Sequence, residues 1–293
     1  MLELQVPKRF DLQSMHTLLG QALDLQGDPR AAKICLNFSG VSFVETTGVT
    51  VLSNLIERLQ KRGATVTFTG CDRKDQGVKY LDDSGFFEEY WGSGLSQSAK
   101  LRSTTYPFRK LTCEQSHHFL DGDLFPWLAN KLGVHVSSLY ALKTCVREIF
   151  NNIQDHSTEQ IGCMHLQVYP TVDKVMIAIS DFGVGIPTEV RKASAAPDDF
   201  EALKIATTPG FSSKPKTKNR GIGLNYLIDT VVHQSRGFVQ IYSGLGKISF
   251  NYGEAGTKGG TTLSLYPGTL VSMMIPKENL PEPDEEGSEE VSW

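Results

Sequence analysis

The sequence lacks several features that mark particular protein classes. It has no run of about 18 or more apolar residues, so we expect no membrane-spanning helix. Its first residues have no apolar centre of the kind that a secretion signal carries. There are five cysteines, an odd number, and no C-x-x-C pair. This pattern favours free thiols in a reducing compartment over a disulfide framework or a metal cluster, and we expect a cytoplasmic protein.

The chain also has little net charge. Its formal charge is −4, and the segment 277–293 holds seven acidic residues and one lysine, so the rest is close to neutral. That balance argues against charge-driven binding to nucleic acid. Hydrophobic residues make up 40% of the 293 residues, which is ordinary for a globular protein and enough for two cores. We expect the acidic tail 277–293 to be disordered.

Residues 1–92 read as alternating strands and helices. Apolar and β-branched runs predict strands over 32–38 and 64–69, and an amphipathic pattern predicts a helix over 48–62 that ends at Gly63. Another helix is predicted over 74–83. Two strands joined by one helix imply neighbouring strands with a helix packed on them, which is an α/β layer. The segment 93–103 is rich in small polar residues and is expected to be a linker.

Residues 104–276 form a second predicted unit. Helices are expected over 112–132 and 136–156, and strands over 164–169, 174–180, 238–243 and 261–266. The segment 187–220 contains many Ser, Lys, Pro and Gly residues and is expected to be a lid or a binding loop, because long loops commonly have such roles.

The helix over 136–156 carries a polar group of residues near its end. Glu148 and Asn152 are four residues apart and share a helix face, which Asp155 continues. A carboxylate beside an amide carbonyl can polarise a water or hydroxyl and ligate Mg²⁺. The same pattern is also typical of a solvated helix face.

A carboxylate and two glycines follow the apolar strand 175–180. Asp181 stands at the strand end, where it can accept a hydrogen bond from the exocyclic amine of adenine, and Gly183 and Gly185 let the backbone approach a flat ring. An ordinary glycine turn gives the same sequence. Later in the chain, Thr261 enters another strand and can join the Asp181 carboxylate through a water.

A second glycine turn precedes an apolar-periodic helix. Gly221 and Gly223 come just before Leu224, and exposed N–H groups at such a helix start favour an anion. Four cations that would suit a triphosphate precede this turn, although a solvated loop also accounts for them: Lys214, Lys216, Lys218 and Arg220.

In the order E-x-x-x-N, D-x-G-x-G, G-x-G-L and G-T, these elements resemble the GHKL ATP-binding fold of gyrase, heat-shock chaperones, sensor histidine kinases and mismatch-repair ATPases. The resemblance implies a Bergerat α/β sandwich, with a mixed sheet covered by helices on one face, that binds ATP and Mg²⁺. It implies Glu148 as the general base and Asn152 as the Mg²⁺ ligand. The other nucleotide-binding residues expected are Asp155, Asp181, Gly183, Gly185, Lys214, Arg220, Gly221, Gly223, Leu224 and Thr261.

Residues 1–92 resemble the STAS domain of anti-sigma-factor antagonists and sulphate transporters. The resemblance rests on the strand and loop 34–44, the turn Glu45-Thr46-Thr47-Gly48 and the segment 78–87. In antagonists this turn usually reads Asp-Ser-Ser-Gly, with the second Ser accepting phosphate, and Thr47 occupies that position here. Thr47 and Thr46 are therefore candidate phosphorylation sites, and helix N-capping is the alternative role.

Together the two resemblances imply an ATP-binding regulatory protein of the anti-sigma-factor, partner-switching type, acting as a Ser/Thr protein kinase or ATPase with Glu148 as base. The alternative is a non-enzymatic, ATP-gated scaffold for protein interaction. The expected partners are regulatory proteins related to STAS domains or sigma factors. The sequence leaves a homodimer open, and a DNA-linked ATPase is the weakest reading because the chain has no strongly basic domain.

Overall fold

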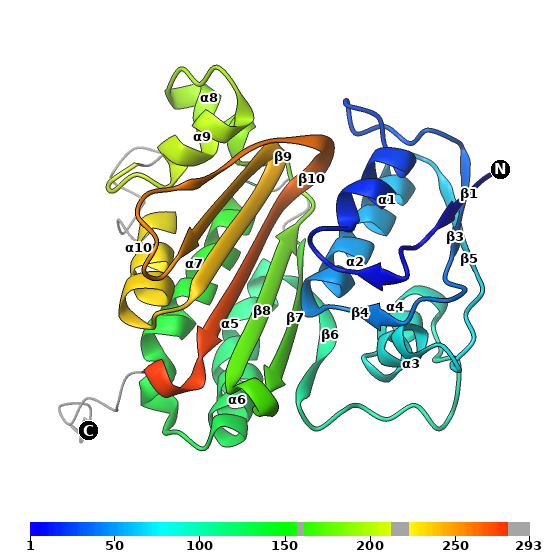
Figure 1. Cartoon of the computed structure of the whole chain (residues 1–293), viewed down its shortest axis with the longest axis horizontal. Coiled ribbons are helices and arrows are strands. Elements are labelled where there is room, and N and C mark those ends of the chain that lie inside the picture. Colours follow the sequence, from blue (N-terminus) through cyan, green and yellow to red (C-terminus); the bar gives the residue numbers. More distant parts are fainter. Residues whose placement is uncertain (157–160, 212–222, 281–293) are drawn as a thin grey trace.

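The computed structural model describes residues 1–156, 161–211 and 223–280, and it has two layered units side by side (Figure 1). The N-terminal unit contains a three-stranded parallel sheet in the order β1-β3-β5 and a separate parallel pair, β2-β4. These strands are β1 (Leu2–Gln5), β2 (Arg9–Phe10), β3 (Lys33–Asn37), β4 (Phe43–Val44) and β5 (Thr65–Thr69).

Four helices complete this unit: α1 (Met15–Ala22), α2 (Thr46–Lys61), α3 (Gln76–Asp83) and α4 (Phe86–Trp91). Helix α2 connects β3 to β5, which pair in parallel with Ile34 opposite Val66. The predicted strand–helix–strand order is therefore confirmed. Gly63 follows α2 with a φ of 82°, in the left-handed region that glycine enters without a steric cost.

The C-terminal unit is built on a five-stranded sheet in the order β6-β7-β8-β10-β9. Every neighbouring pair is antiparallel, so the expected mixed sheet is wrong for the described strands. The difference has a simple cause, because β7–β8 and β9–β10 are hairpins, whereas parallel neighbours need longer crossovers. The strands are β6 (Thr105–Thr112), β7 (Ile161–Tyr169), β8 (Lys174–Asp181), β9 (Phe238–Asn251) and β10 (Lys258–Pro276).

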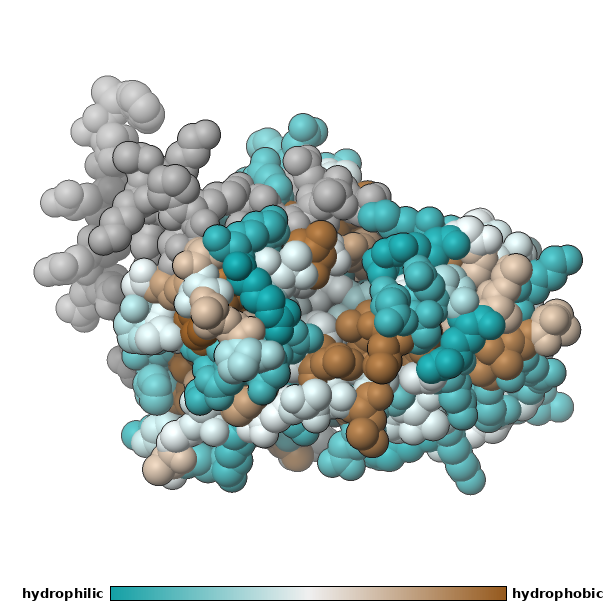
Figure 2. Space-filling view, turned by 90° about the horizontal axis from the view of Figure 1, so that it is seen from above, coloured by the Kyte–Doolittle hydropathy of each residue, from teal (hydrophilic) through white to brown (hydrophobic). Residues whose placement is uncertain are grey.

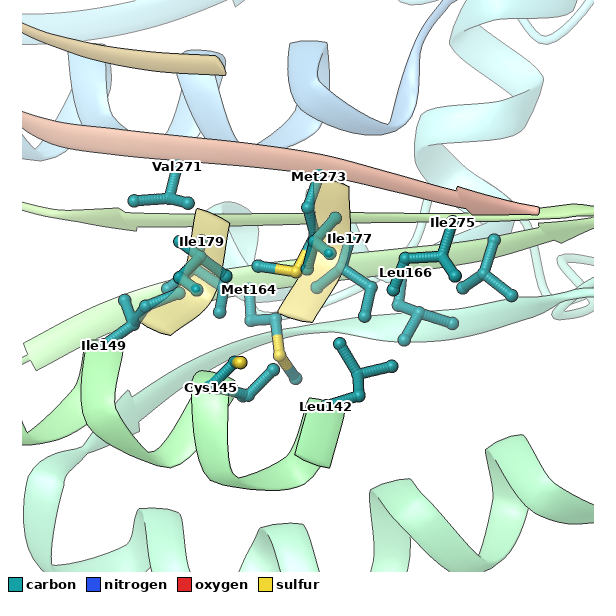
Figure 3. Packing of buried hydrophobic residues seen from close by; sticks show 14 of the residues in the cluster. Leu142, Cys145, Ile149, Met164, Leu166, Ile177, Ile179, Val271, Met273 and Ile275 are labelled. Carbon is teal, nitrogen blue, oxygen red and sulfur yellow. The ribbon is translucent and has the colours of Figure 1, made fainter. Parts of the chain in front are cut away.

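Helices of the C-terminal unit cover one face of this sheet. They include α5 (Cys113–Phe119), α6 (Phe125–Leu132), α7 (Tyr140–His156) and α10 (Leu224–Ile228), with π-helical turns η1 (Leu120–Leu124) and η4 (Asp229–Gln234) and short 3₁₀ turns η2 (Val136–Leu139), η3 (Pro170–Val172) and η5 (Lys277–Asn279). Figure 3 shows Leu142, Cys145 and Ile149 of α7 below apolar side chains of β7, β8 and β10. None of the described helices is long and apolar enough to cross a bilayer.

The other face of the same sheet is covered by the N-terminal unit. Helix α1 contacts β10, and α2 contacts β7, β8 and β10. Cys163, Ala178 and Tyr242 of the C-terminal sheet belong to the same buried cluster as the core of the N-terminal unit. Helices therefore lie on both faces of the sheet, one layer from each unit, and the two units share a core.

The predicted linker 93–103 is tied to α3. The N–H of Leu95 donates to Oδ1 of Asp82 (2.7 Å), and the N–H of Lys100 donates to Oδ1 of Asp83 (3.2 Å). Both carboxylates also pair with Arg73. The connection between the units is therefore anchored and is not a free tether.

The predicted lid or binding loop 187–220 is helical over much of its described part, 187–211, and its residues 212–220 lie outside the described residues. It contains α8 (Ile186–Ala193) and α9 (Asp199–Ala206). Asp199 pairs with Arg191 of α8 (2.7 Å) and accepts from the N–H of Leu245 in β9 (2.7 Å). These bonds fix the two helices to each other and to the edge strand of the sheet.

Candidate functional site

Asp181 is the last residue of β8, and its side chain lies on the face covered by α7. Side chains alternate along a strand, and Val175, Ile177 and Ile179 all pack in the cluster that includes α7. One Asp181 carboxylate oxygen, Oδ1, accepts from the N–H of Gly183 (2.6 Å). Burial raises the pKa of Asp181 to about 6, against the lowering effect of hydrogen bonds from Gly183 and Thr269. At neutral pH the group is ionised and is stabilised by few hydrogen bonds, so it is suited to accept another donor.

Thr269, and not Thr261, is the threonine beside this carboxylate. In the β8–β10 pairing Leu270 lies opposite Ser180, so Thr269 is next to Asp181, and its side chain hydrogen-bonds to the carboxylate. Thr261 is exposed and lies opposite Gly246 in the β9–β10 hairpin. The expected role of Thr261 at the Asp181 carboxylate is therefore wrong. Sequence reasoning missed Thr269, although Gly268-Thr269 repeats the Gly-Thr pair of Gly260-Thr261.

Two glycines allow the strand ends to approach each other at this carboxylate. Gly268 has a φ of 77°, and a Cβ there would be 2.7 Å from Oδ1 of Asp181. Gly185 has a φ of 84°, and a Cβ there would be 2.7 Å from Oγ of Ser243. Any larger residue at these positions would push apart the segments that surround Asp181.

Glu148 and Asn152 lie one turn apart on α7, and both are half-buried. Glu148 accepts from Nδ2 of Asn151 (3.3 Å). The next turn of α7 packs on the start of β7, because a Cβ on Gly162 would be 2.8 Å from Cδ1 of Ile153. Gly162 is the strand partner of Asp181. The end of α7 and Asp181 therefore lie at the same end of the C-terminal unit and on the same side of its sheet.

The second glycine turn is described only in part. Gly223 precedes α10, Leu224 is its first residue, and α10 contacts α7. Leu224 is half-buried and packs on the same core as α7. The structure does not describe the side chain of Asp155, and the other predicted phosphate-binding residues, Lys214, Lys216, Lys218, Arg220 and Gly221, also lie outside the described residues.

Thr46 and Thr47 are buried at the interface of the two units and are both 0% exposed. The Thr46 hydroxyl is bonded to the Tyr169 hydroxyl (3.0 Å), and the Thr47 hydroxyl donates to Glu45 (2.7 Å). In this arrangement a phosphate on Thr46 or Thr47 would have to enter a packed interface, and the phosphorylation of either residue stays a prediction. The N-cap residue is Glu45, which makes no side-chain cap bond, so the capping role is not seen.

Behind Asp181, on the α2 side of the sheet, lies a residue that sequence reasoning also missed. Asn54 of α2 is 1% exposed, and its Nδ2 donates to Oγ of Ser180 (2.6 Å), to the carbonyl of Asp181 (2.8 Å) and to the carbonyl of Pro267 (2.8 Å). The available signal was a single amide in a helix segment that is otherwise small or apolar. Asn54 links the N-terminal unit directly to the backbone of Asp181.

The described residues fit a Mg²⁺–adenine nucleotide in chemistry. The half-buried carboxylate of Asp181 and the hydroxyl of Thr269 suit the donor–acceptor edge of adenine. The amide of Asn152 with the carboxylate of Glu148 suits Mg²⁺, which commonly keeps water and phosphate ligands. No group of three or more His, Cys, Asp and Glu residues able to hold a metal occurs among the described residues. A separate cavity of about 80 Å³ lies elsewhere, lined by Leu142, Thr230 and Ile275 among others.

Figure 2 views the molecule from above, from the end at which β8 terminates, and apolar side chains are exposed in the middle of this face between hydrophilic regions. Val184, three residues after Asp181, is 46% exposed. Exposed apolar side chains beside a polar group are typical of ligand or partner sites.

Comparison with known families agrees with both units. Residues 2–99 match the model of the STAS domain, and residues 139–271 match the model described as histidine kinase-, DNA gyrase B- and HSP90-like ATPase. The first match extends to 99, beyond the predicted boundary at 92. No curated protein matches the chain significantly. The chain therefore joins an N-terminal STAS domain to a C-terminal GHKL ATPase domain.

Proposed function

We propose that this protein is an ATP-binding regulator of the partner-switching type, in which the nucleotide state of the GHKL domain controls binding of another regulatory protein. The observation that carries the proposal is Asp181, a half-buried carboxylate with a raised pKa at the end of β8, bonded to Thr269 and on the same side of the sheet as Glu148 and Asn152. The two domain families support the same assignment. A cytoplasmic location and partners related to STAS domains or sigma factors fit this role.

In this proposal each part of the site has one task. Asp181 accepts from the adenine amine, and Thr269 holds the carboxylate in place. Asn152 ligates the Mg²⁺ that neutralises phosphate charge, and Glu148 takes the proton from an attacking water or hydroxyl. Gly223 and Leu224 begin the helix at the phosphate end, with Asp155, Lys214, Arg220 and Gly221 proposed beside them.

The position of the STAS domain bears on what the protein phosphorylates if it is a kinase. Thr46 and Thr47 are the first residues of α2, which covers one face of the sheet, whereas Glu148 lies on α7, which covers the opposite face. Transfer from the site to these hydroxyls within one chain would have to pass through the sheet. A separate protein is therefore the proposed acceptor. The same separation favours the second candidate, an ATP-gated scaffold that transfers no phosphate.

Calorimetry of the full chain with ATP and Mg²⁺ tests the binding part of the proposal. We expect association with the wild type and none with Asp181→Asn, because the new amide would present a donor to the adenine amine. Thr269→Ala is expected to weaken ATP binding about tenfold, the equivalent of one hydrogen bond to a charged group. Thr261→Ala is the matched control and should bind normally. Absence of any heat with the wild type would contradict the proposal.

The enzymatic part needs a second measurement. Incubation with γ-labelled ATP, alone and with a separate STAS protein that has an exposed acceptor serine, should give phosphate release or a labelled partner. Glu148→Gln should reduce either product by at least about a hundredfold while retaining ATP binding. Tight binding without label or phosphate release would reject the kinase and ATPase versions and leave the scaffold.

A further inference from the structure

Asn54 is a polar residue in an interface made mainly of apolar side chains. It lies in the middle of α2, in a stretch from Thr46 to Ile56 in which every residue is buried. Its Nδ2 is within hydrogen-bond distance of three acceptors, from Ser180, Asp181 and Pro267. Its Oδ1 has no partner in the described part of the chain. Packing alone does not require an amide here, because an apolar side chain would leave no unsatisfied atom. The amide makes specific hydrogen bonds at the cost of one buried oxygen without a partner among the described residues.

The orientation of this amide follows from its partners. The oxygens of Asp181 and Pro267 are backbone carbonyls and can only accept. A flipped amide would place Oδ1 against both of them and lose both bonds. Asn54 is therefore the donor at this point, and it binds the backbone on which the nucleotide-site residues are mounted.

Those two carbonyls belong to the strands that carry the proposed adenine-binding side chains. Asp181 ends β8, and Pro267 lies two residues before Thr269 in β10. Between them is Gly268, where the two strands approach so closely that a side chain would collide with Asp181. The pairing of β9 with β10 is irregular just there, between Tyr266 and Thr269, so the ladder alone holds this segment weakly. The amide of Asn54 ties the two strands together from behind.

We infer that Asn54 is a positioning residue of the nucleotide site. Through its hydrogen bonds, the docking of the STAS domain on the sheet sets the distance between Asp181 and Thr269, and this distance determines the affinity for the base. The inference rests on the proposed function. Coupling between two equilibria is reciprocal. If docking of α2 on the sheet raises the affinity for nucleotide by some factor, nucleotide binding must favour the docked position of α2 by the same factor. The N-terminal domain then acts on the site through the backbone of Asp181 and Pro267.

The test compares Asn54→Ala with Ser53→Ala in the full chain. Ser53 is the neighbouring residue and is also fully buried. Its described hydrogen bonds go to Tyr90 of its own domain (2.5 Å) and to Cys163 of the GHKL sheet, and not to the backbone of Asp181 or Pro267. ATP and GTP affinities are measured for both variants and for the wild type. GTP is the probe for base recognition, because guanine has an acceptor where adenine has its amine.

We expect Asn54→Ala to weaken ATP binding about tenfold and GTP binding much less, so that the preference for ATP shrinks, while Ser53→Ala keeps the wild-type preference. A residue that only supported folding would lower the melting temperature without changing this ratio. An unchanged ratio in Asn54→Ala therefore overturns the inference. Failure of the wild type to bind ATP would instead overturn the proposed function.

If Asn54→Ala does not fold, hydrogen exchange of the wild type decides. With Mg²⁺ and ATP, the amides of α2 around Asn54 should exchange more slowly than without nucleotide, together with those of 181–186. Protection confined to 181–186, with α2 unchanged, would show that the nucleotide site and the STAS helix are not coupled.

Discussion

The two faces of the GHKL sheet are both buried, but they are built differently. Toward α7 the sheet presents aliphatic side chains such as Ile177, Ile179 and Met273, which pack without hydrogen bonds (Figure 3). Toward the STAS domain it presents polar groups among the apolar ones, and these are bonded across the interface. His165 and Gln167 bond to Tyr80, and Ser180 bonds to Asn54.

The two faces therefore contribute differently: the aliphatic face mainly to stability, and the hydrogen-bonded face mainly to the specificity of the domain arrangement. Aliphatic packing tolerates many arrangements of similar volume, whereas buried hydrogen bonds are satisfied in one register only. The face toward α7 resembles the interior of one domain, and the face toward α2 holds the second domain in a single position. The STAS domain is therefore a fixed layer of the protein, and its α2 surface is covered by the GHKL sheet.

The largest expected effect comes from a substitution in the aliphatic face toward α7. Ile177 of β8 is fully buried on the face of the sheet that α7 covers (Figure 3). Ile177→Ala should lower the free energy of unfolding by about 2–5 kcal/mol, because it removes apolar contacts and leaves a cavity. Ile177→Val is the matched control and should cost only about 0.5–1.5 kcal/mol. Urea unfolding measures both, and equal small losses would contradict the close packing of this face.

A smaller effect, of about 1–4 kcal/mol, should appear on the polar face when the pH falls. Burial lowers the pKa of His165 to about 3, from 6.5 in an unfolded chain. The Tyr80 hydroxyl donates to Gln167, so it accepts from Nε2 of His165, and the ring is neutral with its proton on that nitrogen. Between pH 6.5 and 3 the unfolded chain binds the extra proton at His165, so the contribution of His165 to stability falls as the pH decreases through that interval.

The variant His165→Gln tests this prediction, because glutamine can still donate to Tyr80 but does not titrate. Its free energy of unfolding should depend less on pH than that of the wild type between pH 6.5 and the acid limit of folding. Ile177→Val should retain the wild-type slope, since the substitution removes no titrating group. A slope unchanged in His165→Gln would show that His165 is not a buried neutral group.

Much of the fold could be predicted from the sequence because local patterns carry it. The strand–helix–strand order of residues 33–69 and the strand ending at Asp181 follow from periodicity and glycine stops. The docking of α2 was missed, although two signals were present. The strand 175–180 is apolar at nearly every position, which is typical of burial on both faces, and α2 has no charged residue between Glu45 and Glu57.

The candidate site was predictable only in part, because its geometry depends on strand register. Helix periodicity places Glu148 and Asn152 on one face, and the end of an apolar strand marks Asp181. Both are local features that the sequence shows directly. The choice between Thr261 and Thr269 depends on the irregular pairing of β10 with β9, where the register shifts twice between Thr261 and Thr269. No short motif reports such a shift. Asn54 is over a hundred residues from its partners, and only the packing of the two domains brings them together.

The smallest predicted effect concerns Asp181, where the two faces meet, since its carboxylate lies toward α7 and its carbonyl is held by α2. Because the pKa of this group is raised from 3.8 to about 6 on folding, the folded chain binds more protons between those values. The carboxylate therefore destabilises the free protein fully above pH 6 and not below 3.8. Asp181→Asn should raise the free energy of unfolding at pH 7 by about 1–3 kcal/mol in the absence of nucleotide.

With ATP present the order should reverse, because ligand binding stabilises only the wild type. Thermal unfolding at pH 7 with and without Mg²⁺ and ATP measures both effects, and Thr261→Ala should behave as the wild type in each. The gain of the Asn variant should also shrink as the pH is lowered toward 4, where the wild-type carboxyl is protonated. A variant that is less stable than the wild type without ATP would mean that the ionised carboxylate is a structural partner, and the site would then exist for folding and not for a ligand.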